Sequence, residues 1–172
     1  MQKVKTKDLI KGKSRELFNE YGVKNVTLRE VAFQLKKSYG NITYHYSTKE
    51  QLIYELFNDM NKELSALQLV PSQTNLLEYF LSLPSHSYDI TLKYLFFSID
   101  YVELQRNYPE FFKEVEVLNE KRKHLWLTLL KKLREDGYLL RKLTLQELAY
   151  IMFLSVSVRT FYFQSNSQKK YD

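Results

Sequence analysis

The segment Ser38–Glu50, SYGNITYHYSTKE, concentrates three tyrosines, a histidine and several small polar residues in one short stretch. Phenol, amide and imidazole groups can hydrogen-bond to phosphate oxygens and base edges, and aromatic rings can stack on flat partners. A buried core would favour rings without hydroxyl groups, whereas a purely solvated face would favour charged residues. The composition of this segment therefore predicts a surface that binds an anionic partner with flat groups.

The spacing within this segment predicts a short helix that begins after Ser38, a favourable N-cap. Ile42 and Tyr46 are four residues apart, so they share a helix face and can pack on Val31 and Leu35 of the preceding segment. The other side chains then face outward: Tyr39, Gly40, Asn41, Thr43, Tyr44 and His45. Such a helix fits the major groove of DNA, where its first residues meet base edges and flanking groups hold the backbone.

Two further residues, Thr27 and Lys49, stand at predicted helix starts, where free backbone N–H groups can bind a phosphate. Each residue of the set also has an ordinary alternative role, because a capping threonine usually only caps and an exposed tyrosine usually only covers core. The order and spacing of the whole set favour nucleic-acid recognition over that alternative.

Three helix starts in close succession position these residues. A predicted first helix over 3–21 ends at Gly22, and TLRE (Thr27–Glu30) forms a capping box at the start of the second. Ser38 begins the third, and STKEQL, from Ser47, begins the fourth. Short helices joined by tight turns are typical of a helix-turn-helix domain.

Charge is distributed unevenly along the chain, whose net charge is +6. Residues 1–50 carry 11 Lys and Arg against 5 Asp and Glu, whereas residues 51–172 carry 15 of each kind. The whole positive excess thus lies in the segment that holds the candidate recognition helix, as expected of a basic domain that meets a polyanion. Charge alone would fit an inactive basic surface equally well.

The segment Leu17–Ile53 resembles the DNA-binding head of the TetR/AcrR family of bacterial transcriptional regulators. These positions agree with the family pattern: Leu17, Phe18, Gly22, Thr27, Val31, Ala32, Ser38, Gly40, Ile42, Tyr44, His45, Lys49 and Glu50. The resemblance implies phosphate contacts by Thr27, Tyr44, His45 and Lys49. It implies base-edge or groove contacts by Tyr39, Gly40, Asn41 and Thr43, next to the cap at Ser38.

Four positions depart from the family pattern. Lys36 replaces the turn glycine and would adopt a left-handed conformation at a cost of roughly 1–2 kcal/mol. Lys37 replaces an apolar residue, Thr43 stands where a second tyrosine is frequent, and Tyr46 replaces phenylalanine. These changes leave the fold intact and make the operator sequence unpredictable.

The rest of the chain is predicted to be helical, because it has no strand pattern and the whole sequence holds only 4 glycines and 3 prolines. Helices are expected over about 48–67, 73–83, 88–107, 109–136 and 145–164. The predicted fold is all-α, with an N-terminal three-helix helix-turn-helix head (1–47) fused to a C-terminal helical bundle for effector binding and dimerisation (48–172).

An aromatic stripe in the predicted body could line a ligand pocket. Tyr94, Phe97 and Tyr101 share a helix face and could join Phe57 and Trp126, although such stripes are mostly ordinary core. The family resemblance implies an effector pocket in the body, which here would suit a small apolar or aromatic molecule.

The segment 145–164 is apolar around most of its circumference, so in a monomer one side of it would face water. We therefore expect a homodimer through 109–136 and 145–164, as the resemblance also implies. The alternative is a core helix within one chain. A two-fold dimer would place two recognition helices about 34 Å apart, suited to palindromic half-sites.

Several classes are disfavoured by what the sequence lacks. There is no cysteine, no apolar run after the basic N-terminus, and no stretch long enough to cross a bilayer, which favours the cytoplasm. No phosphate-cradling glycine loop or nucleophile elbow occurs, and His45, His86 and His124 have no metal-site spacing. We expect no enzyme activity, cofactor or metal.

Two main hypotheses follow. The first is a TetR-like regulator of double-stranded DNA, a repressor released from a palindromic operator by a small-molecule effector. The second is a helical interaction protein whose basic head binds a membrane surface or a protein partner without sequence-specific DNA recognition. A variant of the first has a body that senses a protein instead of a small molecule.

Overall fold

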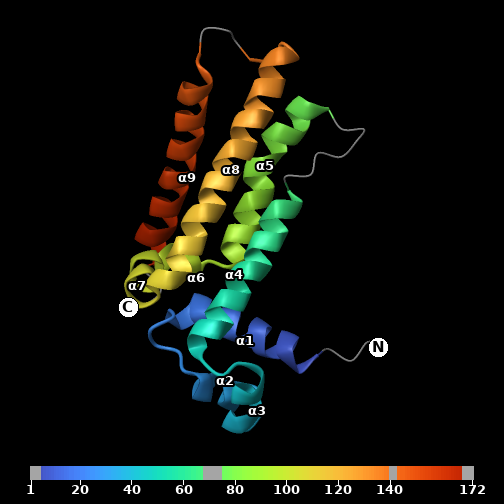
Figure 1. Cartoon of the computed structure of the whole chain (residues 1–172). Coiled ribbons are helices and arrows are strands. Elements are labelled where there is room, and N and C mark those ends of the chain that lie inside the picture. Colours follow the sequence, from blue (N-terminus) through green and yellow to red (C-terminus); the bar gives the residue numbers. More distant parts are fainter. Residues whose placement is uncertain (1–4, 68–74, 140–142, 168–172) are drawn as a thin grey trace.

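The structure is a computed structural model that describes residues 5–67, 75–139 and 143–167. The described residues form helices only, which confirms the all-α prediction. The helices are α1 (Thr6–Tyr21), α2 (Leu28–Gln34), α3 (Tyr39–His45), α4 (Lys49–Ala66), α5 (Leu76–Lys93), α6 (Phe96–Ile99), α7 (Tyr101–Asn107), α8 (Pro109–Glu135) and α9 (Leu145–Ser167). Figure 1 shows α1, α2 and α3 at one end of the molecule, and α4 leading from them into the body.

The helix starts of the head follow the predicted signals. The Thr27 side chain accepts a hydrogen bond from the Glu30 N–H in a complete capping box, and the Ser38 side chain accepts one from the Asn41 N–H. The N-cap of α4 is Thr48 and not its neighbour Ser47. Lys36 adopts the left-handed conformation expected of it, with φ of 53°.

One continuous core joins the head to the body. Ile10 and Phe18 of α1 are completely buried, as are Ile42 and Tyr46, and they belong to the same cluster as Phe111 of α8. Helix α4 contributes to both ends of this cluster, and no break in packing marks residue 48. The division into 1–47 and 48–172 therefore remains a prediction.

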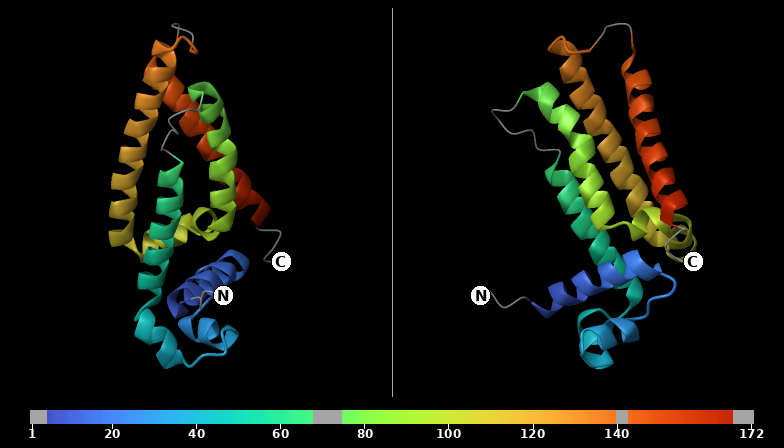
Figure 2. Two further views of the ribbon diagram at one scale, coloured as in Figure 1. Left: turned by 90° about the vertical axis from the view of Figure 1, so that its right-hand side faces the viewer. Right: turned by 180° about the vertical axis from the view of Figure 1, so that it is seen from behind.

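The body consists of long helices that run along the molecule, with the short helices α6 and α7 at the end nearest the head. In both views of Figure 2, α4, α5, α8 and α9 extend away from the head, and α6 and α7 lie beside α1. Helices α8 and α9 contact each other, and α9 also contacts α6. The predicted helices over 109–136 and 145–164 correspond to α8 and α9.

Two predicted helices, 73–83 and 88–107, were placed wrongly. Helix α5 continues through exposed Pro84 to Lys93, while residues 73 and 74 lie outside the described part of the chain. The rest of 88–107 is divided into α6 and α7. The break between α5 and α6 has a tertiary cause: the Asn19 side chain on α1 accepts a hydrogen bond from the Phe96 N–H and donates one to the Lys93 carbonyl, both at 3.0 Å.

Candidate nucleic-acid interface

Helix α3 is fixed from behind by two side chains. Ile42 and Tyr46 have no exposed surface, and they share a cluster with Val31 while Leu35 packs against it, as the spacing predicted. Burial raises the pKa of the Tyr46 hydroxyl to about 12, and this hydroxyl has no hydrogen-bond partner among the described residues. The residue is thus held as an apolar anchor.

The opposite face of α3 presents rings and small polar groups to solvent. Tyr44 is 83% exposed and lies edge-on to His45, with ring centroids 5.1 Å apart. Gly40 and Asn41 are exposed, and Gly40 has no atom near the place where a Cβ would be. Thr43 donates its hydroxyl back to the Tyr39 and Gly40 carbonyls, so only its methyl group and its acceptor lone pairs remain for a partner. The outward face suits close approach of a duplex.

Thr27 is exposed, but its donors are already in use. Its backbone N–H and its hydroxyl both donate to the Glu30 carboxylate, at 2.6 and 2.9 Å. A phosphate that takes hydrogen bonds from Thr27 must therefore displace the Glu30 carboxylate. The predicted phosphate contact by Thr27 remains a prediction with this added condition.

The Lys49 ammonium is already engaged within the protein. Its ammonium donates to the Val23 and Val26 carbonyls at 2.8 and 3.0 Å, which ties the turn between α1 and α2 to the start of α4. Burial lowers the pKa of Lys49. The expectation that this ammonium is free for phosphate does not match the structure, because two turn carbonyls without helical partners hold it. A phosphate contact near Lys49 remains a prediction, but through other donors.

Two cations that the sequence interpretation did not assign join this surface. The Arg29 guanidinium lies 5.2 Å from the centroid of the Tyr39 ring, so α2 adds a positive charge beside the first turn of α3. Lys36 is exposed in the turn between the two helices. Arg29 is part of the TLRE motif, and its outward position in that motif could have indicated its place on this surface.

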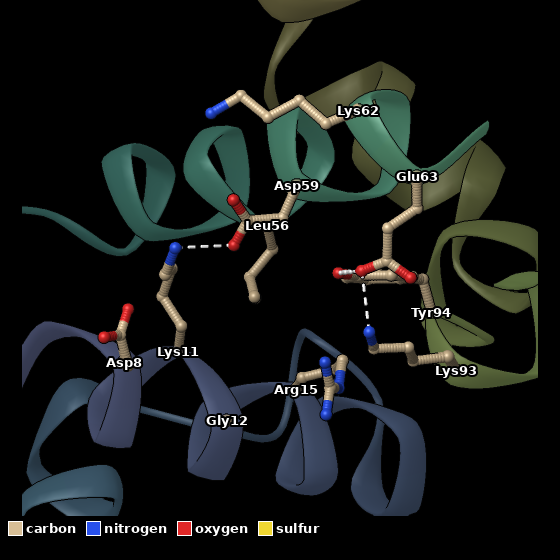
Figure 3. A pocket seen from close by; sticks show the side chains of 10 residues that line it. All are labelled: Asp8, Lys11, Gly12, Arg15, Leu56, Asp59, Lys62, Glu63, Lys93 and Tyr94. Carbon is tan, nitrogen blue, oxygen red and sulfur yellow. Dashed lines mark hydrogen bonds and ion pairs between the residues drawn. The ribbon is translucent and has the colours of Figure 1, made fainter. Parts of the chain in front are cut away.

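The head is tied to the body through polar contacts on one side. The Val23 N–H donates to the Asp100 carboxylate at 2.6 Å, and burial raises the pKa of Asp100. A neighbouring open hollow between α1 and α4 has a volume of about 400 Å³. Figure 3 shows its lining side chains, among which Lys11 pairs with Asp59 across the two helices. These contacts set the orientation of the head relative to α4 and α6.

The five predicted effector residues do not gather around one cavity. Phe57 and Phe97 pack against Phe111 in the core, with ring centroids of 5.7 Å for Phe57–Phe97 and 4.7 Å for Phe57–Phe111. Trp126 packs against Phe80 of α5. Tyr94 donates to Glu63 and lines the hollow of Figure 3, whereas Tyr101 is 40% exposed beside Phe112. The stripe is divided because residues 94–101 span the end of α5, α6 and the start of α7.

Helix α9 carries a wide exposed apolar face. The exposed large side chains of this helix are Tyr150, Ile151, Phe153, Leu154, Val158, Phe161 and Tyr162. Within the described ranges, no helix is long and apolar enough to pass through a bilayer. Those ranges also contain no group of three residues able to hold a metal ion.

Comparisons with known proteins agree with this geometry. A family model described as bacterial regulatory proteins of the tetR family matches residues 12–56. Among solved structures, a TetR-family transcriptional regulator from Marinobacter aquaeolei has 25% identity and a TM-score of 0.81, with 96% of this chain and 81% of that chain covered. No curated protein sequence matches the chain.

Two other solved structures share the fold at lower identity. The ketosteroid transcriptional regulator KstR2 of Mycobacterium tuberculosis has 19% identity and a TM-score of 0.75, with 98% of this chain and 92% of that chain covered. The fatty acid degradation regulator FadR from Bacillus halodurans has 17% identity and a TM-score of 0.72, with 98% and 88% covered. The family model matches the N-terminal segment that holds α2 and α3, and the fold is shared along almost the whole chain, so the comparisons support assignment to the TetR family of bacterial regulatory proteins.

Proposed function

We propose that this protein is a cytoplasmic, homodimeric transcriptional repressor that binds a palindromic operator in double-stranded DNA and leaves it when a small-molecule effector binds the body. It acts by binding and not by catalysis. The observation that carries the proposal is the two-sided character of α3: Ile42 and Tyr46 are completely buried, while Tyr39, Asn41 and Tyr44 face solvent. A helix anchored in this way can enter the major groove without losing its hold on the head.

The residues divide into two kinds of proposed contact. Tyr39, Gly40, Asn41 and Thr43 lie in the first turns of α3 and would meet base edges, after the cap at Ser38. Tyr44 and His45 would reach phosphate oxygens, with Arg29 and Lys36 as flanking cations. Backbone groups at the start of α4, at Lys49, would complete the grip on the backbone, together with Thr27 once the phosphate displaces the Glu30 carboxylate.

The dimer is supported by the apolar face of α9. Phe153, Val158 and Phe161 are between 65% and 70% exposed in the single chain, and α8 lies beside α9 with exposed Val117 and Leu125. Burial of apolar surface of this kind is the main driving force of subunit association. Pairing α8 and α9 with a second copy about a two-fold axis would present two heads to successive turns of one duplex face.

The effector would act on the spacing of the two heads. Near-complete release from the operator requires that the effector favour the non-binding state by about 5.5 kcal/mol. The Asp100–Val23 and Lys11–Asp59 contacts join the body helices to the head, so a shift of those helices would reach α3. A solidly packed body without effector binding would instead support a protein signal.

The test begins with selection of duplexes bound by the full-length protein from a random pool. Fluorescence anisotropy then compares the selected duplex with a scrambled one for the wild type, Asn41→Ala and Tyr44→Ala. Tyr138→Ala serves as the matched control, because Tyr138 is an exposed tyrosine (45%) beyond the end of α8.

We expect the wild type to bind the selected duplex at least a thousandfold more tightly than the scrambled one. Its affinity for DNA should fall steeply with added salt. Both α3 variants should weaken binding tenfold or more while retaining the wild-type fold, and Tyr138→Ala should bind normally. Equal affinity for selected and scrambled duplexes would overturn the proposal and favour the interaction protein without sequence-specific DNA recognition.

A further inference from the structure

A half-buried cation without an anionic partner lies inside the body. The Arg122 guanidinium, on α8, donates to the Asn61 side-chain oxygen on α4 and makes a long contact of 3.5 Å with the Asn119 oxygen. No carboxylate in the described part of the chain forms a salt bridge with Arg122. Burial lowers the pKa of this guanidinium, as expected when no opposite charge offsets the loss of water.

Asn61 has an unsatisfied donor at the same place. Its side chain is buried, with 8% of the residue exposed. A guanidinium can only donate, so the Asn61 oxygen must face Arg122 and the amide nitrogen Nδ2 must turn away. That nitrogen has no acceptor among the described residues. Arg122 and Asn61 together lack one thing, an acceptor that carries negative charge.

Space for such an acceptor exists next to Asn61. A hollow of about 330 Å³ lies against α4, with Leu118 of α8 on one side. The α4 residues that line it are Glu55, Asn58, Asn61, Lys62 and Ser65, and the opposite charges of Glu55 and Lys62 offset each other. Leu118 stands one helical turn before Arg122 on the same face of α8. The hollow therefore brings the unsatisfied Asn61 donor next to the apolar Leu118 side chain, and Arg122 adjoins it through its hydrogen bond to Asn61.

Aromatic layers lie on both sides of the donor pair along the bundle. Phe57 is one turn before Asn61 on α4 and packs on Phe111. Trp126 is one turn after Arg122 on α8 and packs on Phe80. Two of the residues first expected in an effector pocket thus flank the donor pair, although they do not line one cavity with the others.

We propose that Arg122 and Asn61 form the head-group site for a small organic carboxylate. The carboxylate accepts from the guanidinium and from Asn61 Nδ2, and the apolar part of the ligand packs against Leu118. Charge-assisted hydrogen bonds from a guanidinium to a carboxylate are among the strongest of their kind, and their fork geometry selects a planar anion. Carboxylate binding stands on these residues alone, whereas the regulatory role of the ligand rests on the proposed function.

The first experiment measures ligand binding to the full-length protein by isothermal titration calorimetry. The probes are benzoate and the straight-chain carboxylates from butyrate to dodecanoate, with the matching neutral amides as controls. We expect at least one carboxylate to bind tenfold or more tightly than its amide. Arg122→Gln should lower the affinity for that carboxylate at least tenfold. Arg106→Gln, which changes an exposed arginine on α7, should leave the affinity unchanged.

A second variant tests the same site by supplying the missing charge from the protein itself. Asn61→Asp places a carboxylate against Arg122, so we expect a higher Tm without ligand and loss of carboxylate binding. Gln105→Glu adds the same charge at an exposed position of α7, away from the residues that line the hollow, and it should retain binding. Failure of every carboxylate to bind, or wild-type affinity in Arg122→Gln or Asn61→Asp, would overturn the site.

Adding the best carboxylate to the complex with the selected duplex separates the site from the regulatory role. Release of DNA by the wild type but not by Arg122→Gln supports both. Binding without any change in DNA affinity supports the site and overturns the effector role. Release that persists in Arg122→Gln overturns the site and leaves an effector acting elsewhere in the body.

Discussion

Replacing Lys49 by methionine separates a structural role for this residue from a DNA contact. Methionine keeps the apolar stem but removes the ammonium, which donates to the Val23 and Val26 carbonyls at 2.8 and 3.0 Å. Without it, the turn between α1 and α2 loses its link to the start of α4. The turn is also the segment whose Val23 N–H reaches Asp100.

The expected cost can be worked from the two hydrogen bonds. A hydrogen bond to a charged group contributes about 1.5–3 kcal/mol, and the freed carbonyls will recover part of this from water because Lys49 is only half-buried. We therefore expect Lys49→Met to lower the free energy of unfolding by about 2–3 kcal/mol, a large fraction of the 5–15 kcal/mol typical of a domain. Lys24→Met, at an exposed lysine in the same turn, should change it by less than about 0.5 kcal/mol.

Urea unfolding followed by far-ultraviolet circular dichroism measures the loss of stability. Operator affinity is then measured against salt concentration under conditions where the variant is folded. Since the ammonium faces inward, the salt dependence should match that of the wild type. Unchanged stability, together with a salt slope smaller by about one, would show that Lys49 contacts a phosphate and would refute this reasoning.

Three other substitutions have definite expected outcomes. Lys36→Gly should stabilise the protein by about 0.5–1 kcal/mol in urea unfolding, because Lys36 has a left-handed φ of 53°. Lys37→Gly, at the next residue, should destabilise the protein. The opposite order of stabilities would contradict the argument that Lys36 is strained. Tyr46→Phe should stabilise by about 1 kcal/mol, because it removes a buried hydroxyl without a recorded partner, and Tyr44→Phe at the exposed site should leave thermal stability unchanged. Phe161→Glu should convert a dimer into monomers in analytical ultracentrifugation and weaken operator binding, whereas an unchanged mass would exclude this face of α9 from the interface.

The features that the sequence predicted well depend on residues within one or two helical turns. The capping box at Thr27, the cap at Ser38 and the inward pair Ile42 and Tyr46 are all local patterns, and the structure confirms each of them. The left-handed Lys36 also follows from its place in a tight turn that a glycine usually fills.

The features that the sequence could not predict depend on distant partners. Asn19 ends α5 and starts α6 from across the core, and nothing near residue 94 indicates this. Lys49 turns inward because the Val23 and Val26 carbonyls lie within its reach. The same Asn19 contacts divide the aromatic stripe between helices. The donor pair of Asn61 and Arg122 joins residues that lie 61 positions apart in the sequence.

The position of α3 on DNA is tested most directly by methylation protection of the selected operator. Dimethyl sulfate modifies guanine N7 in the major groove and adenine N3 in the minor groove, so it distinguishes the two grooves. We expect the wild type to protect guanine N7 in two half-sites about 34 Å apart, and Asn41→Ala to lose that protection at concentrations where the wild type is fully bound. Protection of adenine N3 alone, or a major-groove pattern unaffected by Asn41→Ala, would contradict the assignment of α3 as the recognition helix.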